Sequence, residues 1–460
     1  MFSFNLFLLV NFMSDTIVAL ATPPGRSGIG VIRLSGSGSL EIVRHLINEN
    51  DFLPKPRYAH LKKIYDIETS EILDEAIIIY FKSPNSFTGE DIFEISCHGS
   101  PVILRQIIDF CLKLDARLAE PGEFSLRALA NGRINLSQAE AIRDLIDSQT
   151  LSAVKQSVRQ LEGEVSYQLQ PLKDELLEVI VVLESALEFV EDDLPDFQIE
   201  NIKLKLESVS RKIGQFSATY QAGKFLREGL SVAIVGRPNV GKSSLFNALL
   251  GQDRSIVTDI AGTTRDQIHE KISFDGIPIS LIDTAGLRET FDLVESLGVE
   301  RAKRSLADAD FVVVLLDGSQ TITEEDLNVL HQVNDINHLI AINKIDLEQV
   351  SSNLNGTKVI RISAKTGEGL DELQKNVMEP FMNSFDVNSG FLISDARHYD
   401  LLLRAQSEID SSINLLNKKL SEEIILVGLH NAINLLGQIT GETTTDDMLT
   451  QIFSTFCIGK

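Results

Sequence analysis

The sequence predicts a multidomain α/β protein with three parts, and three patterns along its 460 residues indicate them. In the first part, short β-type runs alternate with clusters of Gly, Pro and Ser, as in a mixed α+β domain. From Leu230, strand-like and helix-like runs alternate, which is typical of a doubly wound parallel sheet. Amphipathic helical segments lie on both sides of that stretch, so we expect one discontinuous helical bundle into which the α/β domain is inserted.

Each part is predicted from its own runs of residues. The expected strands of the first part are TIVALA, GVIRLSG, EAIIIYF and DIFEISCHG. From about Ser137 onward, Ala139, Ile142 and Leu145 recur at helical spacing. Helical character returns after about residue 383 in LLLRAQSEIDSSINLL and SEEIILVGLHNAINLLGQIT. Between the two helical pieces, the α/β part contains LSVAIVG, ISLIDTAG, DFVVVLLDG, HLIAINK and KVIRIS.

The changes in pattern also set the expected domain boundaries. Residues 1–12 are apolar but too short to span a bilayer, and they have neither a preceding Lys or Arg nor a following small-residue cleavage site. We expect them to be a disordered extension or not to be translated, because Met13 offers a plausible start. The expected domains are 13–132 (α+β), 133–227 (first helical piece), 228–383 (α/β) and 384–460 (second helical piece).

Composition limits the partners. The formal net charge of -24 repels a phosphate backbone at long range, so work on nucleic acid would need a local basic patch or a more basic partner. The three cysteines, Cys97, Cys111 and Cys457, form neither a disulfide framework nor a zinc-type spacing, and their number suits a reducing cytoplasm.

A phosphate-binding loop is predicted at GRPNVGKSS, residues 236–244. The stretch follows a strand-like run, opens a helix-like one and fits G-x-x-x-x-G-K-[ST], which argues against a merely Gly-rich turn. In this pattern backbone N–H groups cradle the phosphates, Lys242 reaches the β and γ oxygens, and Ser243 offers its hydroxyl to Mg²⁺.

Three further segments indicate that the nucleotide is GTP. In DTAG, Asp283 can hold Mg²⁺ through water and the Gly286 N–H can sense the γ-phosphate. In NKID, Asp346 can accept two N–H bonds from guanine; a buried carboxylate here would be left unpaired against adenine. In SAK, the Ala364 N–H can approach guanine O6. The order and spacing of these segments resemble the Ras-like translation-factor GTPases. The expected GTP contacts are Asn239, Val240, Gly241, Lys242, Ser243, Ser244, Thr258, Asp259, Ile260, Ala261, Gly262, Thr263, Thr264, Asp283, Thr284, Ala285, Gly286, Asn343, Lys344, Ile345, Asp346, Ser363, Ala364 and Lys365.

The expected hydrolytic machinery departs from the Ras type. Thr264, in IVTDIAGTTRD, is the expected switch residue that closes over Mg²⁺ and the γ-phosphate. Leu287 stands where a Ras-type enzyme carries a water-positioning Gln. We expect Arg265 and Arg288 to form surface ion pairs rather than to act as an arginine finger. Some other charge must therefore compensate in the transition state.

Longer stretches resemble the MnmE (TrmE) family of tRNA-modification GTPases, which belongs with the TrmE-Era-EngA-like GTPases. They are ATPPGRSGIGVIRLSG, PNSFTGED, EPGEFSLRALANGRINLSQAEAI, the phosphate loop with IVTDIAGTTRD, and the terminal FCIGK. The resemblance runs from about Met13 to Lys460. It implies a GTP hydrolase that forms a cytoplasmic homodimer and assembles as a heterotetramer with an FAD-dependent partner, MnmG (GidA). The two proteins would add an aminomethyl or carboxymethylaminomethyl group to carbon 5 of the wobble uridine of certain tRNAs.

The resemblance also implies two cofactor sites. A potassium ion, in place of an arginine finger, would be held by Asn239, Thr258, Ile260 and Thr263, and Glu295 would orient the attacking water. Gly286 and Lys242 would complete the catalytic set with Cys457. The N-terminal domain would bind a 5-formyl- or 5,10-methylene-tetrahydrofolate through Arg33, Glu94, Arg133 and Lys460.

Two questions remain open on the sequence. CIGK is a poor prenylation box, since Gly459 is not aliphatic and Lys460 is last, so Cys457 is either a packed thiol or a catalytic group beside the folate. A ribosome-assembly GTPase that acts as an RNA-binding checkpoint is the alternative function, although the helical tail carries no GXXG-type KH pattern and the N-terminal folate-like part would then be unexplained. A GTP-sensing scaffold without fast turnover is a third possibility.

Overall fold

A computed structural model describes the chain except for residues 1–14, 189–195, 253–268, 275, 284–308, 351–357, 383–390, 443–448, 450, 451, 454, 458 and 460. The chain divides into two compact units. The first comprises residues 1–143, 161–166 and 437–460, and the second comprises residues 144–160 and 167–436.

The first unit is built on a six-stranded sheet in the order β3-β4-β5-β2-β1-β6. Its strands are β1 (Thr16–Leu20), β2 (Ile29–Ser35), β3 (Ala59–Tyr65), β4 (Ile72–Phe81), β5 (Ile92–His98) and β6 (Ala116–Leu118). β1 and β6 are parallel, and the other neighbours are antiparallel. In the same unit, helix α2 (Ser39–Leu46) connects β2 to β3, α3 (Pro101–Lys113) connects β5 to β6, and α4 (Glu123–Ala130) follows β6.

The larger core of this domain lies on one face of the sheet, and a smaller cluster that includes Ile17 and Phe124 lies on the other. Alternate residues of β2 and β5, such as Leu34 and Phe93, are buried with Ile107 and Phe110 of α3. Because successive side chains of a strand point to opposite faces, Arg33 and Glu94 lie on the other face, where they are direct cross-strand partners. The predicted α+β domain is confirmed.

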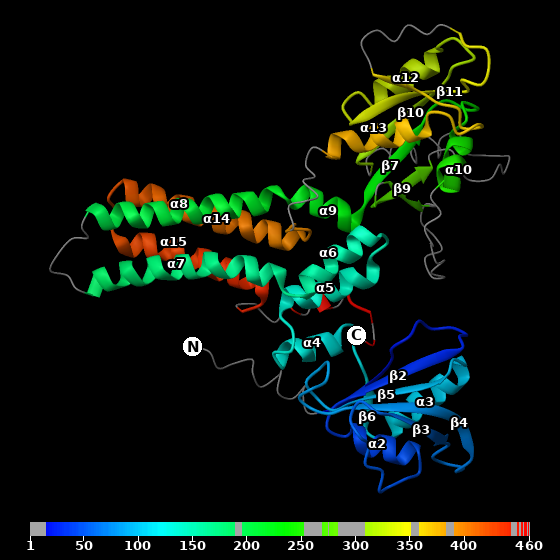
Figure 1. The fold of residues 1–460 in the computed structure, drawn as a ribbon, viewed down its shortest axis with the longest axis vertical. Coiled ribbons are helices and arrows are strands. Elements are labelled where there is room, and N and C mark those ends of the chain that lie inside the picture. Colours follow the sequence, from blue (N-terminus) through cyan, green and yellow to red (C-terminus); the bar gives the residue numbers. More distant parts are fainter. Residues whose placement is uncertain are drawn as a thin grey trace. The chain divides into compact units, whose positions relative to one another are not determined.

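The helical bundle combines segments from both sides of the α/β insertion, as predicted. It comprises α5 (Leu136–Asp147), α6 (Leu151–Leu161), α7 (Glu164–Glu188), α8 (Asp196–Ala218), α9 (Tyr220–Glu228), α14 (Ala396–Asn417) and α15 (Glu422–Thr440). Figure 1 shows α7, α8, α14 and α15 running alongside one another, and α8 packs along α14. Among the residues that the structure describes, none of the helices combines the length and hydropathy needed to cross a bilayer.

The α/β insertion has a six-stranded sheet in the order β12-β11-β10-β7-β9-β8, with β8 antiparallel and the others parallel. Its elements are β7 (Leu230–Val235), α10 (Lys242–Gln252), β8 (His269–Phe274), β9 (Ile277–Asp283), β10 (Phe311–Asp317), α12 (Glu324–Gln332), β11 (His338–Asn343), β12 (Val359–Arg361) and α13 (Leu370–Met382). The strand order reverses beside β7, so ligands are expected at the carboxyl end of this strand. The predicted Ras-like doubly wound domain is confirmed.

Candidate functional site

The phosphate loop joins the end of β7 to the start of α10, where the sequence pattern places it. Val240 is buried in the core of the α/β domain and anchors the loop. Gly241 has φ +101°, and a Cβ atom there would lie 2.3 Å from Nδ2 of Asn343. Only glycine therefore allows the loop to approach Asn343 this closely, and the loop leads directly into the N-terminus of α10, where a helix favours an anion.

Lys242 lies over this loop. Its ammonium donates to the carbonyl oxygens of Gly236 (2.7 Å) and Arg237 (2.9 Å). Ser243 and Ser244 follow it in the first turn of α10, and both are exposed. An ammonium, a helix N-terminus and an exposed hydroxyl together fit a phosphate group with Mg²⁺.

Asn343 brings the phosphate loop and the SAK segment together. Its Nδ2 donates to the carbonyl of Val240 (2.9 Å), while its Oδ1 accepts from the Ala364 N–H (2.9 Å). The side chain is 2% exposed, so both bonds lie out of water. A single buried amide thus fixes the distance between the candidate phosphate site and the candidate guanine site.

Lys344 adds a second connection to the phosphate loop. Its Nζ donates to the Asn239 carbonyl (2.9 Å) and pairs with Oδ2 of Asp317 (2.7 Å) at the end of β10. Burial is the largest influence on the Asp317 carboxyl and raises its pKa, but bonds from Lys344 and Ser319 outweigh it and lower the pKa overall. Asp317 was not predicted as a site residue, although its position at the carboxyl end of the buried strand β10 could have indicated it.

Asp346 lies in the segment that is predicted to bind guanine, and its contact with the base stays a prediction. It lies in an exposed turn after β11, and its Oδ1 accepts from Oγ of Ser363 (2.7 Å). That hydrogen bond, together with the charges of Lys365 and Lys344, lowers the pKa of the Asp346 carboxyl. An ionised carboxylate with the Ala364 N–H held nearby by Asn343 suits the guanine edge.

Several predicted site residues lie outside the described part of the chain. These are Thr258, Asp259, Ile260, Ala261, Gly262, Thr263, Thr264, Thr284, Ala285, Gly286, Glu295 and Lys460, together with Arg265, Leu287 and Arg288. Asp283 ends β9, whose neighbour in the sheet is β7. The described residues thus bring together the phosphate loop, NKID and SAK, and leave the switch and potassium ligands as predictions.

The candidate folate site centres on Arg33 and Glu94. Nε and Nη2 of Arg33 donate to the same carboxylate oxygen, Oε1, at 3.0 and 2.6 Å, and Nη1 donates to the Gly459 carbonyl at 3.2 Å. Within the described chain, Oε2 of Glu94 accepts no hydrogen bond. The guanidinium lies 5.8 Å from the Phe124 ring centre. A carboxylate oxygen and an arginine beside an aromatic ring fit a flat, amide-bearing heterocycle.

The other predicted folate and catalytic residues have different surroundings. Arg133 is exposed after α4, and its side chain lies near Gly89, with no contact to the Arg33 pair among the described residues. Cys457 is exposed, which contradicts the packed-thiol alternative and leaves its catalytic role as a prediction, whereas Cys97 and Cys111 are buried. Burial raises the pKa of Cys97 to about 11 and that of Cys111 to about 12.

A buried charge network in the same unit was not predicted. Arg127 pairs with Asp15 (2.6 Å), Glu123 (2.9 Å) and Glu90 (3.1 Å), and Arg117 bonds both Asp15 and Glu123. Burial lowers the pKa of Arg127 most, but the three carboxylates more than reverse this. The network ties the start of β1 to α4 and the loop before β5, so it serves the stability of this unit.

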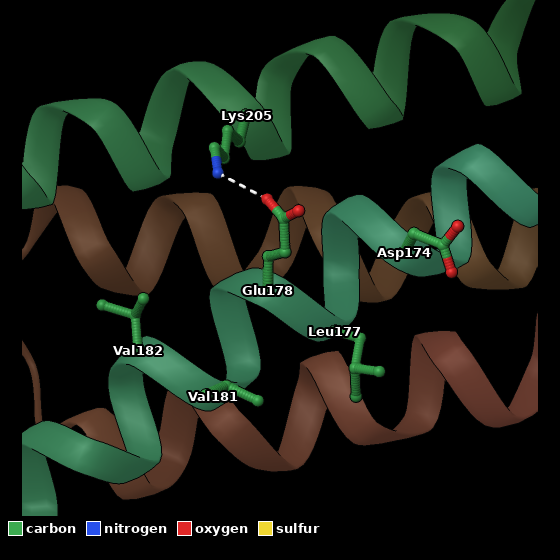
Figure 2. Close-up of a pocket in the computed structure, with 6 residues that line it drawn as sticks. All are labelled: Asp174, Leu177, Glu178, Val181, Val182 and Lys205. Atoms are coloured by element: carbon green, nitrogen blue, oxygen red, sulfur yellow. Dashed lines mark hydrogen bonds and ion pairs between the residues drawn. The ribbon is translucent and has the colours of Figure 1, made fainter.

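A shallow groove of about 510 Å³ lies on the helical bundle, between α7 and α8 (Figure 2). Leu177, Val181 and Val182 form its apolar part, and Glu178 pairs with Lys205 at 2.8 Å across it. Figure 2 shows these side chains on the two helices, with Asp174 one turn before Glu178. None of the predicted site residues lines it.

Comparison with known proteins identifies relatives along the whole chain. Residues 136–457 match the family model "MnmE helical domain", and residues 16–133 match "GTP-binding protein TrmE N-terminus". A tRNA modification GTPase MnmE from Aquifex aeolicus (strain VF5) is 45% identical over 97% of this chain and 100% of its own length. A tRNA modification GTPase MnmE from Koribacter versatilis (strain Ellin345) is 43% identical over 97% of this chain and 100% of its own length. The solved G domain of the FeoB iron transporter from T. maritima is 30% identical, covers 33% of this chain and 97% of its own, and has a TM-score of 0.25.

Proposed function

The chain belongs to the MnmE family of tRNA modification GTPases, and from this premise we propose a potassium-dependent GTP hydrolase that modifies the wobble uridine of certain tRNAs. With an FAD-dependent partner of the MnmG type, it adds an aminomethyl or carboxymethylaminomethyl group at carbon 5. It works as a homodimer within a heterotetramer. Its membership of the family makes it a GTPase acting in tRNA modification; the cation, the partner and the chemical group added are our proposal.

The bridge made by Asn343 is the observation that carries this proposal. It places the phosphate loop and the Ala364 N–H at a fixed separation, on either side of one buried amide. Asp346 adds an ionised acceptor beside Ser363. Phosphate and guanine are therefore recognised by one rigid frame, and this supports GTP rather than ATP as the substrate.

Several residues of the chain have separate roles in GTP hydrolysis. Lys242 binds the β and γ oxygens, and it leaves the carbonyls of Gly236 and Arg237 to do so. Ser243, with Thr264 and Asp283, holds Mg²⁺, which supplies charge to the phosphates when bound. Gly286 senses the γ-phosphate, and Glu295 orients the attacking water.

Asn239 is our choice for the potassium contact, with Thr258, Ile260 and Thr263. It is exposed in a left-handed backbone conformation (φ +63°), and its carbonyl is fixed by Lys344. Within the described chain its side-chain amide makes no hydrogen bond, so its oxygen can serve as a ligand. A monovalent cation there supplies the charge that an arginine finger provides in other GTPases.

For the one-carbon donor we propose a tetrahydrofolate held by Arg33, Glu94, Arg133 and Lys460. Oε2 of Glu94, which accepts no hydrogen bond from the described residues, fits the amide and amine edge of a pterin, and basic side chains fit a glutamate tail. The folate supplies the one-carbon unit when bound, and Cys457, exposed in the same unit, is our candidate participant in the chemistry.

Two measurements test the proposal. Mass spectrometry of tRNA nucleosides from a deletion strain should show loss of the wobble modification; intact modification with a subunit-assembly defect would instead favour a ribosome-assembly GTPase. GTP hydrolysis should rise steeply when Na⁺ is replaced by K⁺, and Asn239→Ala should abolish that stimulation. Equal turnover in both salts contradicts the potassium mechanism.

A further inference from the structure

Three cationic side chains and an exposed aromatic ring gather where the loop before β3 meets the loop after β4. We call Lys55, Arg57, Tyr58 and Lys82 the basic loop surface; all four are exposed. Nη2 of Arg57 donates to the Asn85 carbonyl (2.9 Å), and its backbone N–H donates to that of Tyr80 (2.8 Å). These bonds hold Arg57 against the segment that carries Lys82.

The positive charge of this surface is not cancelled nearby. Among the described residues, Lys55, Arg57 and Lys82 have no carboxylate within ion-pair distance. Glu49 is occupied by Lys62 at 2.5 Å. Asp91 accepts from the Tyr80 hydroxyl (2.8 Å) and the Ser83 N–H (2.9 Å). Asp51, four positions before Lys55 in the sequence, is exposed. In a chain of net charge -24, such a group of cations attracts an anionic partner locally.

The exposed ring of Tyr58 adds an aromatic stacking face to the cations of this surface. Tyr58 is 55% exposed, and its ring lies 5.7 Å from Nζ of Lys55 and 5.0 Å from the His60 ring. Pro54 and Pro56 restrict the backbone of the same loop. A ring held beside cations can stack on an unpaired base while the cations contact phosphates, a combination used by proteins that bind RNA.

We propose that the basic loop surface binds the phosphate backbone of the tRNA substrate next to an unpaired base that stacks on Tyr58. This inference rests on the proposed function, which makes RNA the anionic partner. It supplies the local basic patch that so acidic a chain needs for nucleic acid. An anionic membrane would be attracted by the same charges, but it would not use the ring for stacking.

The test measures binding of fluorescently labelled tRNA to the full-length protein by anisotropy between 50 and 200 mM KCl, salt concentrations at which phosphate contacts change affinity strongly. Lys55→Glu/Lys82→Glu should lower the slope of log Kd against log salt by about two, because each lysine that no longer meets a phosphate lowers it by about one. At 50 mM KCl its affinity should fall by about tenfold or more. Tyr58→Ala should weaken binding by about fivefold or more without changing the slope.

The matched control is Lys155→Glu/Lys375→Glu, which makes the same change in net charge at two exposed lysines elsewhere. It should leave tRNA affinity within about twofold of wild type, and GTP turnover of all variants verifies folding. Equal affinities of the two double variants would overturn the proposal. So would intact tRNA binding with selective loss of binding to phosphatidylserine vesicles. Either result leaves the proposed function standing, because that depends on the nucleosides of the deletion strain.

Discussion

Arg227, near the end of α9, forms an ion pair with Asp395, the residue that caps α14. Nη1 of Arg227 lies 2.8 Å from Oδ2 of Asp395, and its Nε lies 3.0 Å from Oδ2 of Asp144. Oδ1 of Asp395 accepts from the Arg397 N–H (2.8 Å), which completes the cap. Since β7 follows α9 directly and α14 follows the α/β insertion, this pair joins the two segments through which the chain enters and leaves that domain.

The backbone segments that carry Arg227 and Asp395 also lie close to each other. Thr219 Oγ1 accepts from the Ile393 N–H (3.0 Å), and a Cβ atom at Gly223 would lie 2.2 Å from the Ile393 carbonyl oxygen. The rings of Tyr220 and Tyr399 stack at 4.2 Å. The entry and exit segments are therefore locked together, which offers a rigid base from which nucleotide-driven changes could reach the bundle.

We expect Asp395→Asn to lower the free energy of unfolding by about 3 kcal/mol at pH 7, because it leaves Arg227 buried with one carboxylate fewer. Burial raises the Asp395 pKa most, but His398, Arg227 and Arg397 outweigh it, so the pKa is lowered overall. The stabilisation is thus present above the unfolded-state pKa of about 4 and is lost as pH falls toward the folded-state value. Urea unfolding at several pH values checks this.

Asp400→Asn is the matched control for that experiment. Asp400 pairs with Arg404 at 3.4 Å, but both side chains are more than half exposed, and such surface pairs contribute little. We expect its unfolding free energy to stay within about 0.5 kcal/mol of wild type. If the two substitutions cost the same, the buried pair has no special role in joining the two segments.

Structural features that depend on neighbouring residues were predicted from the sequence, whereas features that depend on residues far apart in the chain were not. β7, β10 and β11 are continuous apolar runs and were predicted, as was the loop that follows β7. β3 was missed because it is an edge strand in which two adjacent lysines, Lys62 and Lys63 on opposite faces, interrupt the apolar alternation, and β6 has only three residues. Edge strands carry such lysines, and the pattern then resembles a loop.

The site follows the same rule. The contacts of Asn343 with Val240 and Ala364 arise from local motifs whose order is readable in the sequence. The contacts of Asp317 and Arg227 were not predicted, because the residues next to them in the sequence do not indicate which distant residues they pair with. Arg227 and Asp395, for example, are 168 positions apart. The exposure of Asp346 and Cys457 likewise depends on how turns pack, and a motif does not encode that.

Nucleotide choice should change with Asp346→Asn. The asparagine replaces one carboxylate oxygen by an N–H₂ donor, which opposes the guanine N–H groups but can donate to the 2-oxo group of xanthine. We expect GTP affinity to fall by at least about tenfold, from the loss of a charge-assisted hydrogen bond, and xanthosine triphosphate affinity to rise. Fluorescent-nucleotide titration measures both. Ser363→Ala removes the hydroxyl that bonds Oδ1 and accepts from the Thr366 N–H, but it keeps the Asp346 carboxylate. This variant should retain the preference for GTP; equal loss in both variants argues for a positional role alone.

The three thiols should react at very different rates in the native protein. Cys457 is exposed, whereas burial raises the pKa of Cys97 to about 11 and of Cys111 to about 12, so that little thiolate forms at neutral pH. We expect iodoacetamide at pH 8 to alkylate Cys457 first and the other two only after addition of denaturant. Peptide mass spectrometry follows each site. Native-state alkylation of Cys97 at the Cys457 rate would contradict the packing of the first unit.

The pair formed by Arg33 and Glu94 makes the folate proposal testable without the tRNA reaction. Glu94→Gln keeps the size of the side chain but replaces the carboxylate by an amide, so Arg33 loses a charged partner at 2.6 Å. We expect binding of 5-formyltetrahydrofolate, measured by calorimetry, to weaken by at least about tenfold, since hydrogen bonds to charged groups carry most of such recognition. GTP turnover with K⁺ should not change, because both residues lie in the first unit and the phosphate loop in the second.

Glu75→Gln, at an exposed position of the neighbouring strand β4, is the control and should bind 5-formyltetrahydrofolate as wild type does. Unaltered folate binding in Glu94→Gln would show that the cross-strand pair only stabilises the sheet, and would remove the one described set of contacts on which the folate site rests.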